Sequence, residues 1–265
     1  MLLVVDALNK HRFGSILDQM YQLRARVFQG RMGWDVTVRN GQEIDIFDGL
    51  DPAYIITLNS TYQVTGCARL LQTTGPHMLS DVFHDILDGE PPLRSATIWE
   101  STRFCVDREK LKGDHGGNTV STTTSELMVG IMEYAKQAGI GDIITVIDPL
   151  MDRIMHRSDN APYDYVGKTI QMGKVKALAA LVDCTDERIA KVRAFAGIKG
   201  NIFLPEDEVA TVITPAVETR VNPALQEYCI DQIASAEDDR EHAAAVSLQK
   251  ALLGTSTPER RAYDA

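Results

Sequence analysis

The sequence predicts an α/β protein in which a mixed β-sheet is flanked by helices in three layers. Apolar residues recurring every three or four positions predict helices at residues 121–138 and 186–196. Short apolar and β-branched runs predict strands at residues 143–147 and 174–182, and a further helix is expected from about residue 149 to 156. Because strands and helices alternate along the chain, a sheet covered by helices on its faces is the expected architecture.

A predicted helix over residues 15–29 is followed by a long loop. The helix has one apolar face, and Arg24 and Phe28 are four residues apart, so their side chains lie on one side of it. Residues 30–50 are rich in Gly, Asp and Asn and show no clear period. We expect this segment to be a functional or mobile loop.

A hairpin and a helical extension complete the predicted organisation. Strands at 54–58 and 64–71 flank the turn Asn59-Ser60-Thr61. The last 60 or so residues carry acidic and Ala-rich segments that predict peripheral helices, and a polar tail that we expect to be disordered. We therefore expect a main domain at 1–204 and a C-terminal extension at 205–265.

A third predicted strand, residues 97–106, contains the run from Trp99 to Phe104. Regular alternation along a strand would place Glu100 and Arg103 on opposite faces of the sheet. A β-bulge near Ser101 or Thr102 would bring the two side chains to one side, and bulges are common beside active sites. We predict such a bulge.

Composition limits the classes of function. Hydrophobic residues make up 44% of the 265 residues, enough for a substantial core. The net charge of −10, with no basic block, argues against general nucleic-acid binding. We expect no secretory signal, no membrane span, no metal site and a cytoplasmic location, because no long apolar segment and no metal-ligand spacing is present. The cysteines expected to be free thiols are Cys67, Cys105, Cys184 and Cys229.

Charged and aromatic residues are concentrated among the apolar stretches of the first 104 positions. Ionised groups near a core are rare unless they are paired, because losing their hydration is costly. Two interpretations stay open: the charges bind a charged small molecule, or they form a salt-bridge network that fixes the N-terminal segment to the sheet. The set comprises Arg24, Phe28, Trp34, Glu43, Asp45, Asp48, Arg69, Glu100 and Arg103, and the salt-bridge interpretation applies to Arg24, Asp45, Asp48, Arg69, Glu100 and Arg103.

In order and spacing this set resembles the acyl-homoserine lactone synthases. The resemblance covers roughly residues 15–195, and it implies a fold similar to that of the N-acetyltransferases. It also implies that S-adenosylmethionine is acylated by an acyl carrier protein or coenzyme A thioester and then closes to a lactone, releasing 5′-methylthioadenosine. No cofactor is expected. The matching elements are Arg24-x-x-x-Phe28, Trp34, the acidic Glu43-x-Asp45-x-x-Asp48, Arg69, Phe83, the run Glu100 to Phe104, and Val106-Asp107.

The resemblance implies a binding site for S-adenosylmethionine. Asp45 and Asp48 would face its positive groups, and Arg24 or Arg69 would hold its carboxylate in a fork geometry. The aromatic residues expected at this site are Phe28, Trp34 and Phe104. For Phe104, core packing is the alternative.

The resemblance also implies catalytic roles on the third strand. Glu100 is the candidate base that takes a proton from the substrate amine. Backbone N–H groups from Ser101 to Arg103, at the predicted bulge, would stabilise the oxyanion formed from the thioester.

The acyl chain and its carrier would be recognised elsewhere. Thr145 and Met128 are the candidates for an acyl pocket. Thr145 could instead be an ordinary strand residue, and Met128 could instead be a core residue. Acyl carrier proteins are acidic, so we expect docking at basic residues, although a solvated loop would also explain them. The candidate docking residues are Arg108, Lys110, Lys112, Arg153 and Arg157.

Two rival functions remain. One is an N-acyltransferase that acts on another amine with acyl-coenzyme A, and the other is a non-catalytic regulator that binds S-adenosylmethionine or a signal molecule. The chain also departs from the resemblance at Asp148-Pro149 and Asn160-Ala161-Pro162.

Overall fold

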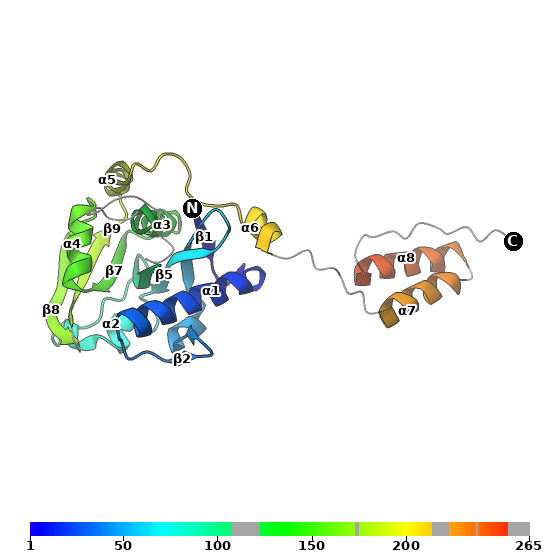
Figure 1. Ribbon diagram of the computed structural model, residues 1–265, viewed down its shortest axis with the longest axis horizontal. Helices are drawn as coiled ribbons and strands as arrows, with labels where there is room; N and C mark the ends of the chain where they lie inside the picture. Colours follow the sequence, from blue (N-terminus) through cyan, green and yellow to red (C-terminus); the bar gives the residue numbers. More distant parts are fainter. Residues whose placement is uncertain (108–121, 173–174, 214–222, 237, 254–265) are drawn as a thin grey trace. The chain divides into compact units, whose positions relative to one another are not determined.

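The computed structural model describes residues 1–107, 122–172, 175–213, 223–236 and 238–253 (Figure 1). The chain divides into two compact units, Met1–Ile213 and Thr214–Ala265. In the second unit, helices α7 (Pro223–Ala234) and α8 (Asp239–Leu253) pack against each other. The division lies after Ile213, so α6 (Glu206–Ile213), which we had assigned to the extension, belongs to the first unit.

A seven-stranded sheet forms the centre of the first unit, with the strand order β1-β4-β5-β6-β7-β9-β8. The β6–β7 pair is parallel, and the other neighbouring pairs are antiparallel. The sheet is therefore mixed, as predicted. Its strands are β1 (Leu2–Val5), β4 (Ala53–Leu58), β5 (Val64–Gln72), β6 (Ile98–Val106), β7 (Asp142–Ile147), β8 (Asp164–Met172) and β9 (Val175–Asp183).

Helices cover both faces of this sheet, which confirms the three-layer prediction (Figure 1). Successive strand residues point to opposite faces: Leu2 and Ile55 join one apolar cluster, whereas Leu3 and Ile56 join another. On the first face lie α3 (Thr122–Gln137), α4 (Pro149–Arg157) and α5 (Asp186–Ala196). On the second face lie α1 (Gly14–Arg24) and α6, with α2 (Met78–Asp81) and the 3-10 helix η4 (His84–Leu87) beyond them.

Two strands of this seven-stranded sheet were not predicted. β1 is a run of four apolar residues at the start of the chain, too short to show a period. β8 lies at the edge of the sheet and is largely exposed, so charged and polar residues interrupt its apolar pattern. The predicted hairpin and the strand at 97–106 are confirmed as β4–β5 and β6.

Residues 30–50, expected to be a functional or mobile loop, contain short regular elements. The end of α1 continues as a π-helix, η2 (Ala25–Arg31), and a small hairpin, β2 (Val38–Arg39) and β3 (Gln42–Glu43), follows. Asn40 and Gly41, at its turn, have φ angles of 52° and 77°, the left-handed conformation that an Asn-Gly turn provides. The 3-10 helix η3 (Ile46–Leu50) completes the segment.

Candidate active site

A cavity of about 1820 Å³ opens where β6 and β7 separate. The two strands pair from Ile98 to Ser101 and from Asp142 to Thr145. Beyond these residues β6 continues beside β5, while β7 continues beside β9. Residues 102–106 therefore line one wall of the cavity, and residues 145–148 line the opposite wall.

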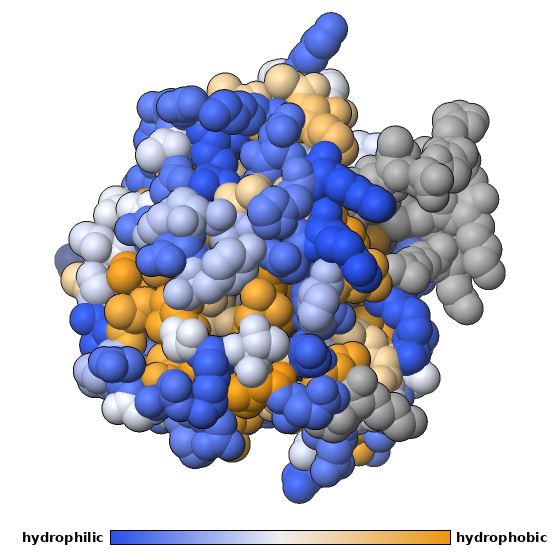
Figure 2. All heavy atoms as spheres, turned by 90° about the vertical axis from the view of Figure 1, so that its left-hand side faces the viewer, coloured by the Kyte–Doolittle hydropathy of each residue, from blue (hydrophilic) through white to orange (hydrophobic). Residues whose placement is uncertain are grey.

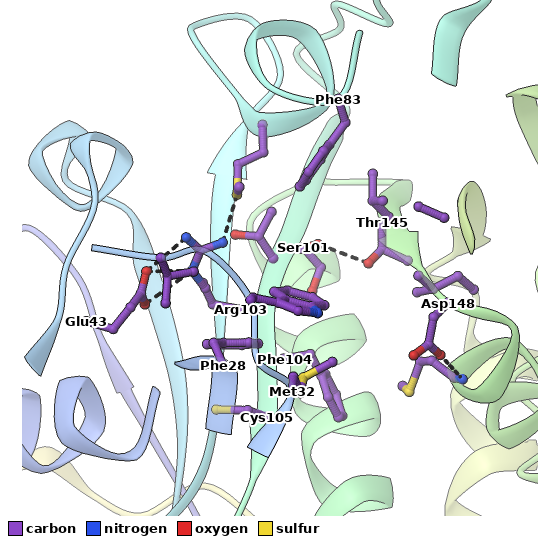
Figure 3. Close-up of a pocket in the computed structure, with 18 of the residues that line it drawn as sticks. Phe28, Met32, Glu43, Phe83, Ser101, Arg103, Phe104, Cys105, Thr145 and Asp148 are labelled. Atoms are coloured by element: carbon purple, nitrogen blue, oxygen red, sulfur yellow. Dashed lines mark hydrogen bonds and ion pairs between the residues drawn. The ribbon is translucent and has the colours of Figure 1, made fainter. Parts of the chain in front are cut away.

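The cavity has a charged, aromatic region and an apolar region. Figure 3 shows Glu43, Arg103 and Phe28 on the β6 side, and Thr145 and Asp148 on the β7 side. Figure 2, which views the side of α4 and β8, shows apolar atoms exposed among hydrophilic ones. Leu150 of α4 is 49% exposed and lines the cavity. The apolar lining residues include Met128, Ile131, Met132, Ile143, Met151, Ile154, Met155 and Met172.

β6 carries the predicted bulge, displaced by one residue. Cys67 pairs with Cys105 and Arg69 pairs with Thr102, so Arg103 and Phe104 together face Ala68. Arg103 has a φ angle of 53°, in the left-handed region. The bulge brings Arg103 to the same side of the sheet as Glu100, where both contact Met78.

Three arginines and three carboxylates form a buried network beside the cavity. Arg24 donates to Glu43 at 2.5 Å and to both oxygens of Asp48 at 2.7 and 2.8 Å. Arg69 donates to both oxygens of Asp45 at 2.5 and 3.0 Å, and to Asp48 at 2.9 Å. Arg103 connects the two ends of the network, donating to Glu43 at 2.9 Å and to Asp45 at 2.8 Å. Since the formal charges balance and each group is paired, the network leaves no buried charge without a partner.

Local structure holds the two aspartates in place. Asp45 is the N-cap of η3 and accepts from the N–H groups of Phe47 and Asp48, while the Asp48 side chain accepts from the N–H of Asp45. Tyr54 also donates to Asp48 at 2.7 Å. Burial alone would raise the pKa of Asp48, but Arg24 and Arg69 outweigh it and hold that pKa well below the usual aspartate value.

Arg24 and Arg69, predicted to hold the substrate carboxylate, lie outside the lining of the cavity. Both are fully buried behind the cavity wall and do not line the cavity, and Asp48 is behind the wall with them. The N–H groups of Arg24 donate to carboxylates, whereas Arg69 also donates to Thr102. Direct contact with a ligand at these positions would require the network to break. The ion pairs expected by the salt-bridge interpretation are present, and a network of this kind can also shape a substrate pocket.

Glu100 is also fully buried and does not line the cavity. Its two oxygens accept from the backbone N–H groups of Met78 at 2.7 Å and Leu79 at 2.6 Å, at the start of α2. Burial raises the pKa of Glu100 to about 7, against the lowering effect of these two N–H groups. The Glu100 side chain therefore positions α2. Its carboxylate, predicted to act as a base, does not reach the cavity in this structure.

The predicted aromatic residues do line the cavity. The rings of Phe28 and Trp34 stack with centroids 5.2 Å apart at 22°, and the Arg103 guanidinium lies 5.4 Å from the Phe28 centroid. Phe104 lines the cavity and also packs against the core on the α3 side. Since Arg103, Asp45 and Ser101 line it too, the cavity presents cationic, anionic and aromatic groups together.

The predicted acyl-pocket residues, Thr145 and Met128, line the same cavity. The Thr145 hydroxyl donates to the carbonyl oxygen of Ser101 at 3.0 Å, which joins β6 and β7 where they begin to separate. Of the predicted docking residues, Arg157 is exposed and lines the cavity, whereas Arg153 is exposed on α4 outside it. The other three, Arg108, Lys110 and Lys112, lie outside the described residues.

One participant, Glu43, belongs to the acidic pattern of the sequence, but no role in the site was predicted for it individually. Glu43, fully buried, accepts from both Arg24 and Arg103 and lines the cavity. The signal that could have identified it is the spacing of Glu43, Asp45 and Asp48, which gives one carboxylate for each arginine of the network.

Comparison with known proteins assigns the family. A family model described as autoinducer synthase matches residues 9–192, more than half of the chain. An acyl-homoserine-lactone synthase of Agrobacterium fabrum (strain C58 / ATCC 33970) is 34% identical over 178 residues, which cover 67% of this chain and 83% of the relative. One from Pseudomonas aeruginosa (strain PAO1) is 35% identical over 170 residues, which cover 63% of this chain and 82% of the relative.

Solved structures agree with this assignment. The crystal structure of the AHL synthase LasI matches with a TM-score of 0.64 and 30% identity, over 73% of this chain and 94% of LasI. MesI, described as a CoA-dependent acyl-homoserine lactone synthase, matches with a TM-score of 0.65 and 26% identity, over 77% of this chain and 98% of MesI. The chain therefore belongs to the autoinducer synthase family.

Proposed function

We propose that the chain is an acyl-homoserine-lactone synthase that joins S-adenosylmethionine to the acyl group of a thioester. The substrate amine attacks the thioester carbonyl and the carrier thiol leaves, forming an amide. The methionine-derived carboxylate then displaces 5′-methylthioadenosine from the sulfonium carbon, which closes the lactone. The reaction includes no cofactor, because the leaving groups belong to the substrates themselves.

The observation that carries this proposal is the single cavity with two chemically different regions. S-adenosylmethionine needs partners for a carboxylate, an ammonium, a sulfonium and an adenine ring, and the charged and aromatic wall offers groups of these kinds. A fatty acyl chain needs an apolar lining, which the methionines and isoleucines of α3, α4 and β7 provide. The space left where β6 and β7 part connects the charged and aromatic region with the apolar region.

Arg103 is our candidate for the substrate carboxylate, in place of Arg24 or Arg69. It lines the cavity, and its Nη1 group donates to the sulfur of Met78 at 3.4 Å. A thioether is a weak acceptor, so a carboxylate would be a stronger partner for this nitrogen. Asp45, 18% exposed, is the network carboxylate most open to the substrate ammonium.

Phe28 and Trp34 are the candidate partners for adenine or the sulfonium. Their stacked rings present an aromatic face next to the charged wall. Attraction of a cation to such a face is worth about 0.5–2 kcal/mol.

We do not expect a strong base to be needed. An α-amino group has a pKa near ~8, so an appreciable fraction is already neutral at pH 7. We assign Glu100 a positioning role through α2, and backbone N–H groups at the bulge remain our candidates for oxyanion stabilisation.

The acyl donor is a carrier protein or coenzyme A thioester. Arg157 lies at the cavity and Arg153 shares its helix, so α4 is the candidate docking element for an acidic carrier. In the parts of the chain that the structure describes, no helix has the length and apolar character needed to cross a bilayer. We propose a cytoplasmic location, where such thioesters are made.

The proposed function is tested by expressing the chain in a bacterium that makes no acyl-homoserine lactones. We expect mass spectrometry of the medium to detect acyl-homoserine lactones, and their masses to give the acyl length. An Arg103→Met variant of equal solubility should make much less product. Soluble wild-type protein in a host supplied with a range of acyl thioesters, without any lactone in the medium, would contradict the proposal.

A further inference from the structure

Cys67 and Cys105 form a close pair of thiols at the cavity wall. They are paired residues on the antiparallel strands β5 and β6, and their sulfur atoms lie 3.5 Å apart. Both side chains are buried and both cysteines are free. A disulfide bond needs about 2.05 Å between the sulfurs, so a small approach of the two side chains would allow one to form.

The pair is connected to the cavity in two ways. Cys105 itself lines the cavity, and Figure 3 places it close to Phe28 and Phe104. The Cys67 thiol donates to the carbonyl oxygen of Arg103 at 3.7 Å, at the bulge that carries the cavity-facing guanidinium. A reagent that enters the cavity therefore meets Cys105 first, and Cys67 lies directly behind it.

We propose that Cys67 and Cys105 are an oxidation site, at which a hydroperoxide converts the two thiols into a disulfide that impairs the cavity. The sulfur of the Cys105 thiol attacks one oxygen of the hydroperoxide and becomes a sulfenic acid, and the other oxygen leaves with the thiol proton as an alcohol or water. The Cys67 thiol then displaces the sulfenic oxygen as a second water, forming the sulfur–sulfur bond. Two thiols and one hydroperoxide are consumed, so the step balances.

Oxidation should alter the wall because two contacts change together. Cys67 loses the hydrogen that it donates to the Arg103 carbonyl, and the sulfurs must move closer by roughly 1.5 Å, the difference between 3.5 Å and a bond length. The bulge at Arg103, already in a left-handed conformation, lies between the two cysteines and the Glu43 and Asp45 pairs.

The first test detects the disulfide directly and does not depend on an enzyme assay. The reduced full-length protein is treated with hydrogen peroxide, and unreacted thiols are alkylated after denaturation. We expect the peroxide-treated protein to take up two alkyl groups where the reduced protein takes up four, and a proteolytic digest to contain a peptide that joins Cys67 to Cys105. Cys184→Ser and Cys229→Ser should give the same product. A Cys105 sulfinic acid beside reduced Cys67, a disulfide with another cysteine, or a pair left reduced would each overturn the proposal.

The effect on the cavity is tested second and rests on the proposed function. We expect the oxidised protein to lose at least fivefold of its acylation rate, and dithiothreitol to restore it. Peroxide should cause no reversible loss in Cys67→Ser, whereas Cys184→Ser should behave as wild type. A disulfide at full activity would contradict the impairment, whereas an inactive chain that still forms the disulfide would count against the proposed function and leave the oxidation site supported.

Discussion

The buried carboxyl group of Glu100 makes stability depend on pH in a predictable direction. Its folded-state pKa, about 7, is above the ordinary value of 4.5, so the folded state binds the proton more tightly than the unfolded state. The contribution to the free energy of unfolding is fully present below pH 4.5 and is lost as the pH rises through 7. A shift of this size corresponds to at most about 3 kcal/mol.

Glu100→Gln should remove this part of the pH dependence. We expect wild type to lose stability, relative to the variant, between pH 4.5 and 7, as measured by urea unfolding at both ends of that range. The variant should also be less stable at low pH, because an amide nitrogen cannot accept from the N–H of Met78 or Leu79. Parallel pH profiles for the two proteins would show that Glu100 does not titrate in this window.

Substitution of Arg24 tests whether its ion pairs are structural or whether it binds a ligand. Arg24→Ala leaves Glu43 and Asp48 without one of their buried partners, so we expect a loss of about 3–5 kcal/mol in the free energy of unfolding. Arg26→Ala is the matched control, because Arg26 is 50% exposed and should cost at most about 1 kcal/mol. If Arg24→Ala instead kept its stability and raised the KM for S-adenosylmethionine, Arg24 would contact the substrate.

At the scale of elements, the β2–β3 hairpin determines where Glu43 lies. Gly41→Ala places a side chain at a φ angle of 77°, so we expect a loss of about 1 kcal/mol and a higher KM for S-adenosylmethionine. Gly49→Ala, for which a new Cβ meets no atom within 4 Å, is the control and should change neither quantity. Circular-dichroism melting and initial rates measure the two effects. Equal behaviour of the two variants would show that the turn does not position the site.

The elements that the sequence predicted well are those with strong periodic patterns. The helices at 122–137 and 186–196 show a helical apolar period, and the strand at 142–147 is a continuous apolar and β-branched run, so their buried packing agrees with the sequence. Residues 30–50 were read as a loop because short elements show no period, although the Asn40-Gly41 dipeptide is a hairpin signal. β8 was missed because an exposed edge strand does not need an apolar pattern.

The sequence predicted which residues belong to the charged network better than it predicted where their side chains lie. The spacing of charged residues identified the network and the bulge, because ionised groups near a core must be paired or functional. It could not separate Arg103, which lines the cavity, from Arg24 and Arg69 behind it, since burial of one side chain depends on residues distant in sequence. Even the bulge lies one residue beyond its predicted position, at Arg103.

At the scale of the whole molecule, the first unit contains every residue that lines the cavity. A chain that ends after Ile213 keeps this cavity and the region matched by the family model, residues 9–192. We expect it to remain folded and to retain activity within about threefold of the full chain, measured as lactone formed per milligram of soluble protein. A soluble truncated protein with no activity would show that the second unit takes part in the reaction.

In the proposed reaction, one cavity brings S-adenosylmethionine and an acyl thioester together. The most direct test measures 5′-methylthioadenosine released by the purified full-length protein, with and without a panel of acyl carrier protein and coenzyme A thioesters. We predict release that requires an acyl thioester and equals the acyl-homoserine lactone formed, mole for mole. Acylation of other amines without 5′-methylthioadenosine, or no release with any thioester of the panel, would contradict the account.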